Sequence, residues 1–378
     1  MTAEFASIQQ NVFTPTCATP GCHIGAAAPQ GLRLDEANSF ALLVGIASTE
    51  VAGVLRVNPN NPDLSYLIQK LEGTATVGGR MPLSGPPFLP QTTIDQLYIG
   101  GQLRTNASYT TVPNQSNEFE FDLEAARLFF ELPLLKNRIT VYLDQQFAPG
   151  SESREAFALL FFRNRSIYIK AGKFFLPFGL RLEDDTEFIR QVTGINFDTP
   201  DEGIEVGFDY GGNSFRLAAT NGTGGGAETD TGKQYSFLYS YVRQRWRAGA
   251  SVNFNDAGSE EKTMVGGFAG VKTGSVVWMG EIDYIKDEAL GPTGRDQLVG
   301  FAEANWRIRQ GHNLKLTYGT FEPDDDVDED EQNRYSIVYE YTPLGFAQIR
   351  VGARIRDGIP QNDLQNTDFY FVQLNAFF

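Results

Sequence analysis

From about residue 104 to the end of the chain, apolar and polar residues alternate with a period of two. In 333–341 (NRYSIVYEY) one face carries Tyr335, Ile337, Tyr339 and Tyr341. The other face carries Arg334, Ser336 and Glu340, with Val338 as an exception, and 298–306 and 347–356 repeat the pattern. Successive side chains of a β-strand point to opposite faces. The pattern therefore predicts many strands, each with one apolar and one charged face.

Three features favour a transmembrane barrel over a soluble sandwich for residues 104–378. Many strands run about 9–13 residues, which suits a tilted strand that crosses a membrane. Tryptophans lie near strand ends, at Trp246, Trp278 and Trp306, and the chain ends in an alternating strand that finishes at Phe378. Such a terminal Phe resembles the assembly signal of bacterial outer-membrane proteins. No run of 18 apolar residues exists, so a membrane-spanning helix is not expected.

The segments from residue 104 number about sixteen antiparallel strands, beginning with 105–112. Very short connections, for example 211–212 and 343–344, alternate with longer ones, for example 221–232 and 322–332. Short periplasmic turns and long outer loops are typical of outer-membrane barrels, and an even count places both ends of the barrel on the periplasmic side. The long connection 176–203 is predicted to fold inward and narrow the pore.

The charge of the chain is negative and uneven. A net charge of −16 argues against nucleic acid as a partner. Segment 322–331 (EPDDDVDEDE) holds eight carboxylates, and a second group consists of Glu183, Asp184, Asp185 and Glu187. These groups either concentrate cations such as Fe(II) or form ordinary solvated loops. On the polar strand faces, Arg350, Arg354 and Arg356 would favour anions in the pore.

The spacing of apolar residues in 1–103 predicts helices instead of strands, so these residues form a separate part of the chain. Helices are expected over 5–13, 37–46, 64–71 and 92–103, with Asp63 as the cap of the third. No signal peptide is visible at the N-terminus, although an exported protein needs one, so we expect it to have been removed.

The segment CATPGCH places a histidine, His23, directly after the second of two cysteines, Cys17 and Cys22. This order predicts covalent attachment of one haem c, with His23 as the proximal iron ligand. Four residues separate the cysteines where two are usual. Alternatively the cysteines form a disulfide, whereas zinc lacks further nearby ligands. Met81, in a Pro/Gly-rich loop, is the candidate distal ligand or else a packing residue. His312 is expected at a turn.

Around these residues the sequence resembles a widespread type of bacterial cytochrome c. The resemblance covers nearly all of 5–103 and includes RVNPNNPDLSYLIQKLEG and GGRMPLSGPPFLPQTTIDQLYIGG. It implies an all-α cytochrome c-like domain over 1–103, with Cys17 and Cys22 attached to haem and His23 and Met81 as axial ligands. The barrel, through YIKAGKFF and the loop that follows, resembles phosphate-selective-type porins.

A short cytochrome followed by a barrel resembles the fused monohaem cytochrome c–outer-membrane porin family of iron-oxidising bacteria. The resemblance implies an outer-membrane electron conduit in a Gram-negative bacterium, with the cytochrome periplasmic or in the barrel lumen. Electrons would pass from an extracellular donor such as Fe(II), through the haem, to a periplasmic cytochrome or another carrier, which amounts to Fe(II) oxidase activity. The alternative is a solute (anion) porin whose haem-bearing part serves as a plug or docking module.

Overall fold

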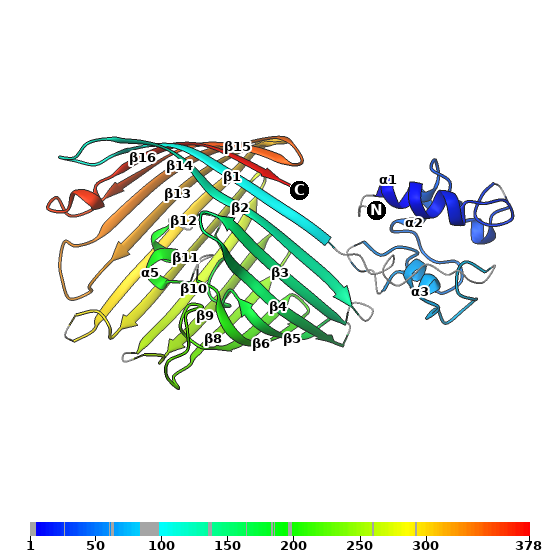
Figure 1. Ribbon diagram of the computed structural model, residues 1–378, viewed down its shortest axis with the longest axis horizontal. Helices are drawn as coiled ribbons and strands as arrows, with labels where there is room; N and C mark the ends of the chain where they lie inside the picture. The colour runs from blue at the N-terminus through cyan, green and yellow to red at the C-terminus, as the bar shows by residue number, and fades with distance from the viewer. Residues whose placement is uncertain are drawn as a thin grey trace. The chain divides into compact units, whose positions relative to one another are not determined.

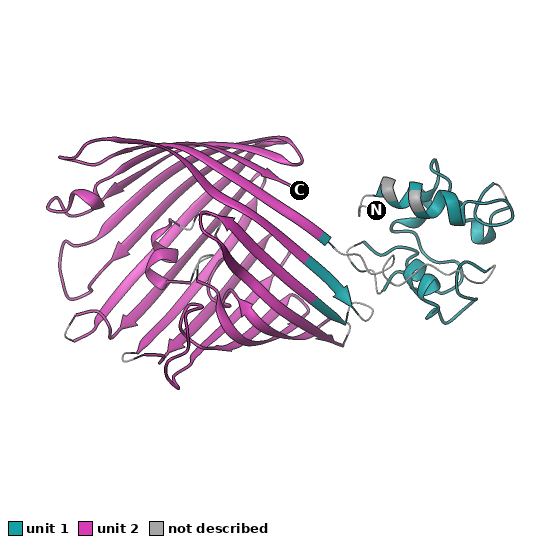
Figure 2. Cartoon of the chain, in the orientation of Figure 1, with its two compact units in different colours: residues 1–98, 131–140 teal, residues 99–130, 141–378 magenta. Residues whose placement is uncertain are grey.

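The structure is a computed structural model that describes residues 5–25, 27–59, 61, 64–83, 98–134, 138–163, 165–182, 184, 186–195, 199–258, 261–291 and 293–378. The chain divides into two compact units, residues 1–98 with 131–140 and residues 99–130 with 141–378 (Figure 2). In the part of the chain that is described, no helix has the length and apolar character needed to cross a membrane.

The N-terminal unit contains short helices joined by irregular segments. These are α1 (Phe5–Ile8), a π-helix (Gln9–Cys17), a 3-10 turn (Pro29–Gly31), α2 (Ser39–Leu43) and α3 (Tyr66–Glu72). A small apolar core of Val12, Phe13, Leu34 and Leu43 holds them together. The helices predicted over 5–13 and 64–71 are present, and the one predicted over 37–46 is shorter. The predicted all-α domain is not evident, since the unit contains only these short helices. Asp63, the predicted cap of the helix over 64–71, lies outside the described residues.

Residues 98–377 contain the sixteen strands of a closed antiparallel barrel, most of which belongs to the second unit, and each strand is hydrogen-bonded to its sequence neighbours (Figure 1). Its strands are β1 (Tyr98–Thr111), β2 (Glu118–Leu134), β3 (Ile139–Ala148), β4 (Glu152–Phe162), β5 (Ile167–Phe174), β6 (Asp201–Tyr210), β7 (Asn213–Thr220), β8 (Gln234–Val242), β9 (Trp246–Asn255), β10 (Lys262–Thr273), β11 (Val276–Asp287), β12 (Arg295–Arg309), β13 (His312–Glu322), β14 (Gln332–Leu344), β15 (Ala347–Asp357) and β16 (Asp368–Phe377). β1 closes the barrel against β16, from Gln102 opposite Phe377 to Thr111 opposite Asp368. The predicted count of sixteen is confirmed.

The first strand begins earlier than the sequence indicated. Residues 98–103 belong to β1 rather than to the end of a helix, so the helix predicted over 92–103 is wrong for these residues, and 84–97 lie outside the described part. Gly100 and Gly101 interrupt the alternation here, and Gly100 is required because the ring of Phe129 occupies the space that a Cβ would fill. The barrel therefore starts at Tyr98 instead of residue 104.

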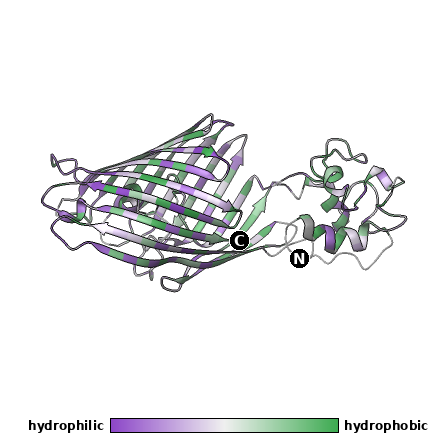
Figure 3. Cartoon of the chain, turned by 90° about the horizontal axis from the view of Figure 1, so that it is seen from above, coloured by the Kyte–Doolittle hydropathy of each residue, from purple (hydrophilic) through white to green (hydrophobic). Residues whose placement is uncertain are grey.

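The predicted faces of the strands are confirmed. On β14, Tyr335 and Ile337 are about half exposed on the outer face, whereas Arg334 and Glu340 are buried inside. Figure 3 shows the resulting alternation of hydrophobic and hydrophilic residues along the strands. An outer apolar face and a polar interior are the arrangement that a lipid environment selects.

The two ends of the barrel differ in the length of their connections. Two or three residues join β6 to β7, β8 to β9, β10 to β11, β12 to β13 and β14 to β15. At the other end the connections are mostly longer, such as 221–233, 323–331 and 358–367, with 149–151 as a short exception. We call the first end the short-turn rim. Because the strand count is even, β1 begins and β16 ends at that rim.

Candidate functional site

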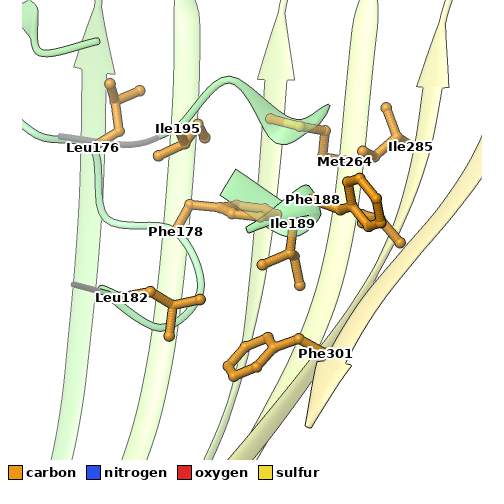
Figure 4. Close-up of a cluster of buried hydrophobic side chains, with 10 residues drawn as sticks. Leu176, Phe178, Leu182, Phe188, Ile189, Ile195, Met264, Ile285 and Phe301 are labelled. Carbon is orange, nitrogen blue, oxygen red and sulfur yellow. The ribbon is translucent and has the colours of Figure 1, made fainter. Parts of the chain in front are cut away.

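The connection between β5 and β6 folds into the barrel, as predicted, and forms its internal core. Its helix α5 (Phe188–Thr193) places Phe188 and Ile189 against Ile285 of β11 and Val299 and Phe301 of β12, all on the inner wall (Figure 4). Ile189 and Val299 are completely buried. Apolar side chains inside a wet barrel are stable only when they cover one another, so this packing fixes the loop to one wall.

Polar contacts of the loop, through its backbone and the Arg190 side chain, with β9 and β11 supplement the apolar packing. Glu281 of β11 accepts hydrogen bonds from Arg190 (2.5 Å) and from the backbone N–H of Leu180 (2.6 Å). The N–H of Gly179 donates to Ser251 Oγ at 2.9 Å. Gly179 has φ +59°, and a Cβ there would meet Glu281 Oε1 at 1.8 Å. Glycine is therefore needed both for the backbone conformation and for the close approach.

Two wall arginines hold the acidic segment of the loop that precedes α5. Arg334 on β14, which is 1% exposed, contacts Asp184 at 2.8 Å and also pairs with Glu187. Arg354 on β15 contacts the same Asp184 oxygen at 2.9 Å. Burial raises the pKa of the Asp184 carboxyl, but the two guanidinium groups outweigh burial and hold the pKa well below its usual range. We call Asp184, Glu187, Arg334 and Arg354 the loop latch.

The loop latch changes the interpretation of two predicted groups. Asp184 and Glu187 are bound to arginines, so they do not form a cation site, and Glu183 and Asp185 lie outside the described residues. In the described residues no group of three or more His, Cys, Asp or Glu side chains could hold a metal ion. In the acidic segment 322–331, Asp324 forms an ion pair with Arg295 at 3.4 Å. These acidic segments therefore show no built metal site in the part described.

The three arginines predicted to face the pore do so, but they are not its free charges. Arg350 contacts Glu340 at 3.2 Å and donates to Gln373 at 2.9 Å. Arg354 belongs to the loop latch, and the Arg356 guanidinium lies over the Phe188 ring. These arginines serve the inner wall and the docked loop.

A second set of cations, which the sequence analysis missed, lines an opening beside the loop. A cavity of about 260 Å³ is lined by one carboxylate, Glu205, and by five basic residues, Lys170, Arg181, Arg190, Arg216 and Arg247. We call it the cationic cavity. These two inward arginines could have been found from the sequence, because alternation along 213–220 and 246–255 places Arg216 and Arg247 on the polar faces of their strands.

Only some of these basic side chains are neutralised. Lys170 contacts Glu205 at 3.1 Å, Arg181 contacts Glu155 at 3.5 Å, and Arg190 pairs with Glu281. Within the described residues, neither Arg216 nor Arg247 has a carboxylate within ion-pair distance, and Arg247 lies over the Phe268 ring. Both also line a neighbouring cavity of about 490 Å³ toward the short-turn rim, where Asp209 is the one carboxylate beside the two arginines. Positive charge is therefore left over along this side of the interior.

A larger cavity on the opposite side has balanced charge. Its volume is about 690 Å³, and its charged lining consists of Arg104, Asp122, Glu124, Glu152, Arg154, Asp184, Arg350 and Arg354. Arg104 contacts Glu124 at 3.3 Å. The four basic and four acidic groups of this cavity therefore cancel in formal charge.

In the N-terminal unit the Cys-His motif forms a tight loop. The His23 N–H donates to the carbonyl of Cys17 at 3.0 Å, and His23 Nδ1 lies 2.9 Å from the Leu32 carbonyl. A histidine ligand usually donates one ring N–H to such a carbonyl, which leaves the other nitrogen for the metal. Both cysteines are free; Cys17 is partly buried beside the apolar core and Cys22 is exposed.

These residues are compatible with a haem c site. The free cysteines disagree with a disulfide. For zinc, the described residues supply no group of three or more His, Cys, Asp or Glu side chains here. Met81 is half-buried and its N–H donates to the Lys70 carbonyl at 2.9 Å. Cys17, Cys22 and His23 would hold the group, and Met81 stays a predicted distal ligand.

His312 is a packing residue at the short-turn rim, as expected of a turn residue. Its ring stacks on Tyr341 with centroids 4.6 Å apart, and Nδ1 lies 2.5 Å from the Tyr339 hydroxyl.

Comparisons with known proteins support the barrel. No family model matches the chain, and no curated protein matches its sequence. A loop-deletion mutant of OmpT, an outer membrane protein of Vibrio cholerae, matches at TM-score 0.60 and 8% identity, over 75% of this chain and 99% of that one. An anion-selective porin from Comamonas acidovorans matches at TM-score 0.59 and 10% identity, over 75% and 100%. The shared feature is the fold of an outer-membrane barrel, and the predicted outer-membrane location is confirmed.

Proposed function

We propose that the barrel is a solute pore of the outer membrane that prefers small anions. The observation that carries this proposal is the cationic cavity, where Arg216 and Arg247 face the interior without carboxylate partners among the described residues. Fixed positive charge in a confined passage raises the local concentration of anions and repels cations. The inward loop narrows the passage, which brings a solute close to these charges.

Conductance across a planar lipid bilayer tests the proposal. In a gradient of potassium chloride, we expect discrete channels whose reversal potential has the sign for chloride permeation. The preference should weaken at 1 M salt, where the screening length falls to about 3 Å. A barrel that inserts but stays closed to ions, or that prefers potassium, would contradict the proposal.

A second function is favoured by the contact of His23 Nδ1 with the Leu32 carbonyl and by the two free cysteines. We propose that the N-terminal unit binds one haem c and transfers electrons. When bound, the haem would supply one-electron chemistry, and the protein would orient the iron ligand and exclude water with the core around Val12 and Phe13. An extracellular donor such as Fe(II) and a periplasmic carrier are the proposed partners.

Protein exported in a host with a cytochrome c maturation system tests this second function. We expect a pyridine haemochrome spectrum of haem c in the full-length protein, and its loss in the C17S/C22S double variant. A heme-stained denaturing gel shows whether the attachment is covalent. Reduction of the haem-loaded protein by Fe(II), followed by stopped-flow absorbance, tests the donor. No covalent haem in the parent protein would refute this function and leave the pore proposal intact.

A further inference from the structure

The outer face of the barrel has an apolar groove across β9 to β15. It has a volume of about 910 Å³ and is lined by outward side chains that include Trp246, Trp278, Leu316, Tyr318, Tyr335 and Ile337. We call it the outer groove. Several of these side chains are about half exposed, for example Trp278 and Tyr335.

The register of the strands creates the groove. Ala248 of β9 lies opposite Ala269 of β10, which lies opposite Gly280 of β11, and Gly280 lies opposite Ala302 of β12. Tyr318 of β13 continues the row opposite Ala302. Four small residues in one transverse row lower the surface, and large aromatic and aliphatic residues stand on either side of it.

The short-turn rim next to the outer groove is strongly basic. The consecutive segments 243–247, 272–276 and 307–311 contain no acidic residue, and they expose Arg243, Arg245 and Arg309 at the rim, whereas the register places Lys272 and Arg307 on the luminal face with Asn305. The three turns are contiguous, because the Lys272 N–H donates to the Arg245 carbonyl at 2.7 Å and the Arg307 N–H donates to Ser275 at 2.9 Å. In a chain of net charge −16, this is a local reversal of sign.

The opposite ends of the same strands are acidic. Asp256 and Glu261 lie between β9 and β10, Glu288 follows β11, and 323–331 follows β13. The charge difference across these strands therefore follows the membrane normal. Tryptophans mark the basic side: Trp246, Trp278 and Trp306 all lie near the short turns, and Trp278 Nε1 donates to Thr273 Oγ1 at 2.9 Å. Tryptophan prefers the interface between the acyl chains and the headgroups.

We propose that the outer groove binds an anionic diacyl phospholipid of the periplasmic leaflet. The acyl chains would fill the apolar hollow, and the phosphate would contact Arg243, Arg245 and Arg309 of the short turns. Charge complementarity selects this occupant, since basic residues at a membrane surface attract anionic lipid headgroups. The proposal depends on the membrane location of the barrel and is independent of its ion selectivity.

The tryptophans allow a direct test in the full-length protein. All three tryptophans of the chain lie at this rim, and W306F leaves Trp246 and Trp278, which line the groove. The variant is reconstituted into phosphatidylcholine vesicles that contain a minor fraction of dibrominated phosphatidylglycerol or dibrominated phosphatidylcholine. We expect stronger fluorescence quenching by the brominated phosphatidylglycerol. Equal quenching by the two lipids would overturn the proposal.

Two pairs of variants separate the headgroup and chain contributions. R243Q/R245Q/R309Q should reduce the preference for phosphatidylglycerol by about fivefold per charge, whereas R163Q/R165Q, at the turn between β4 and β5, should leave it unchanged. A302F, which fills the groove, should reduce quenching by both lipids, whereas A219F on the outer face of β7 should not. A cross-link through A302C between two barrels in the membrane would identify a second copy as the occupant and overturn the proposal.

Discussion

Replacement of Arg334 by alanine should release the inward loop and widen the pore. Arg334 is almost completely buried and pairs with both Asp184 and Glu187. Removal of one partner from a buried ion pair leaves uncompensated charge, which costs about 3–5 kcal/mol. Because the barrel strands keep their own hydrogen bonds, we expect this cost to fall on loop docking. Single-channel conductance in a planar bilayer should rise well above that of the parent protein.

Arg356→Ala is the matched control for this prediction. Arg356 lies on the neighbouring strand β15 with its guanidinium over the Phe188 ring, and among the described residues no carboxylate pairs with it. Its removal takes the same charge from the interior and one contact from the Phe188 ring but leaves the loop latch in place, so conductance should rise much less than in R334A. Equal conductance of R334A and the parent protein would show that the apolar packing around Ile189 holds the loop without the latch.

Replacement of Arg216 and Arg247 by glutamate should invert the ion preference. The double variant R216E/R247E turns two positive charges of the cationic cavity into two negative ones. Lys170, Arg181 and Arg190 keep their carboxylate partners, so the local balance becomes negative. We expect the reversal potential in a potassium chloride gradient to change sign, with channels of otherwise similar size.

The matching control places the same charge change outside the cavity. Arg163 and Arg165 are exposed at the short turn between β4 and β5. R163E/R165E should therefore retain the anion preference, with at most a small shift from the altered rim. If both double variants shift the reversal potential equally, the preference belongs to the net charge of the barrel rather than to the cationic cavity.

Much of the barrel could be predicted because the pattern that determines each strand lies within that strand's own sequence. Alternation along one strand decides which side faces lipid, so the faces of 333–341 and 347–356 followed directly from the sequence. The inward loop could also be predicted from its length. Residues 98–103 were misassigned because two glycines remove the alternation, and only the place of β1 between β2 and β16 in the barrel shows that these residues form a strand.

The charged contacts could not be predicted, because they depend on register and on distant segments. Arg334 and Asp184 are separated by 150 residues and meet only because the loop folds back onto β14. Arg350 and Arg216 look equivalent in sequence, as arginines on polar strand faces. The structure separates them, since Arg350 has Glu340 beside it, whereas no described carboxylate pairs with Arg216. The row from Ala248 to Ala302 likewise exists only across four aligned strands.

The pairing of β1 with β16 has a consequence for the order of assembly. The ten residue pairs that close the barrel join parts of the chain more than 250 residues apart, such as Thr111 and Asp368. Until residues 368–377 are available, β1 and the last strand formed each present an unpaired edge, and such edges invite association with other chains. Closure is therefore the final step of barrel formation, and a chaperone or insertase must protect β1 during the whole interval between its appearance and the arrival of its partner.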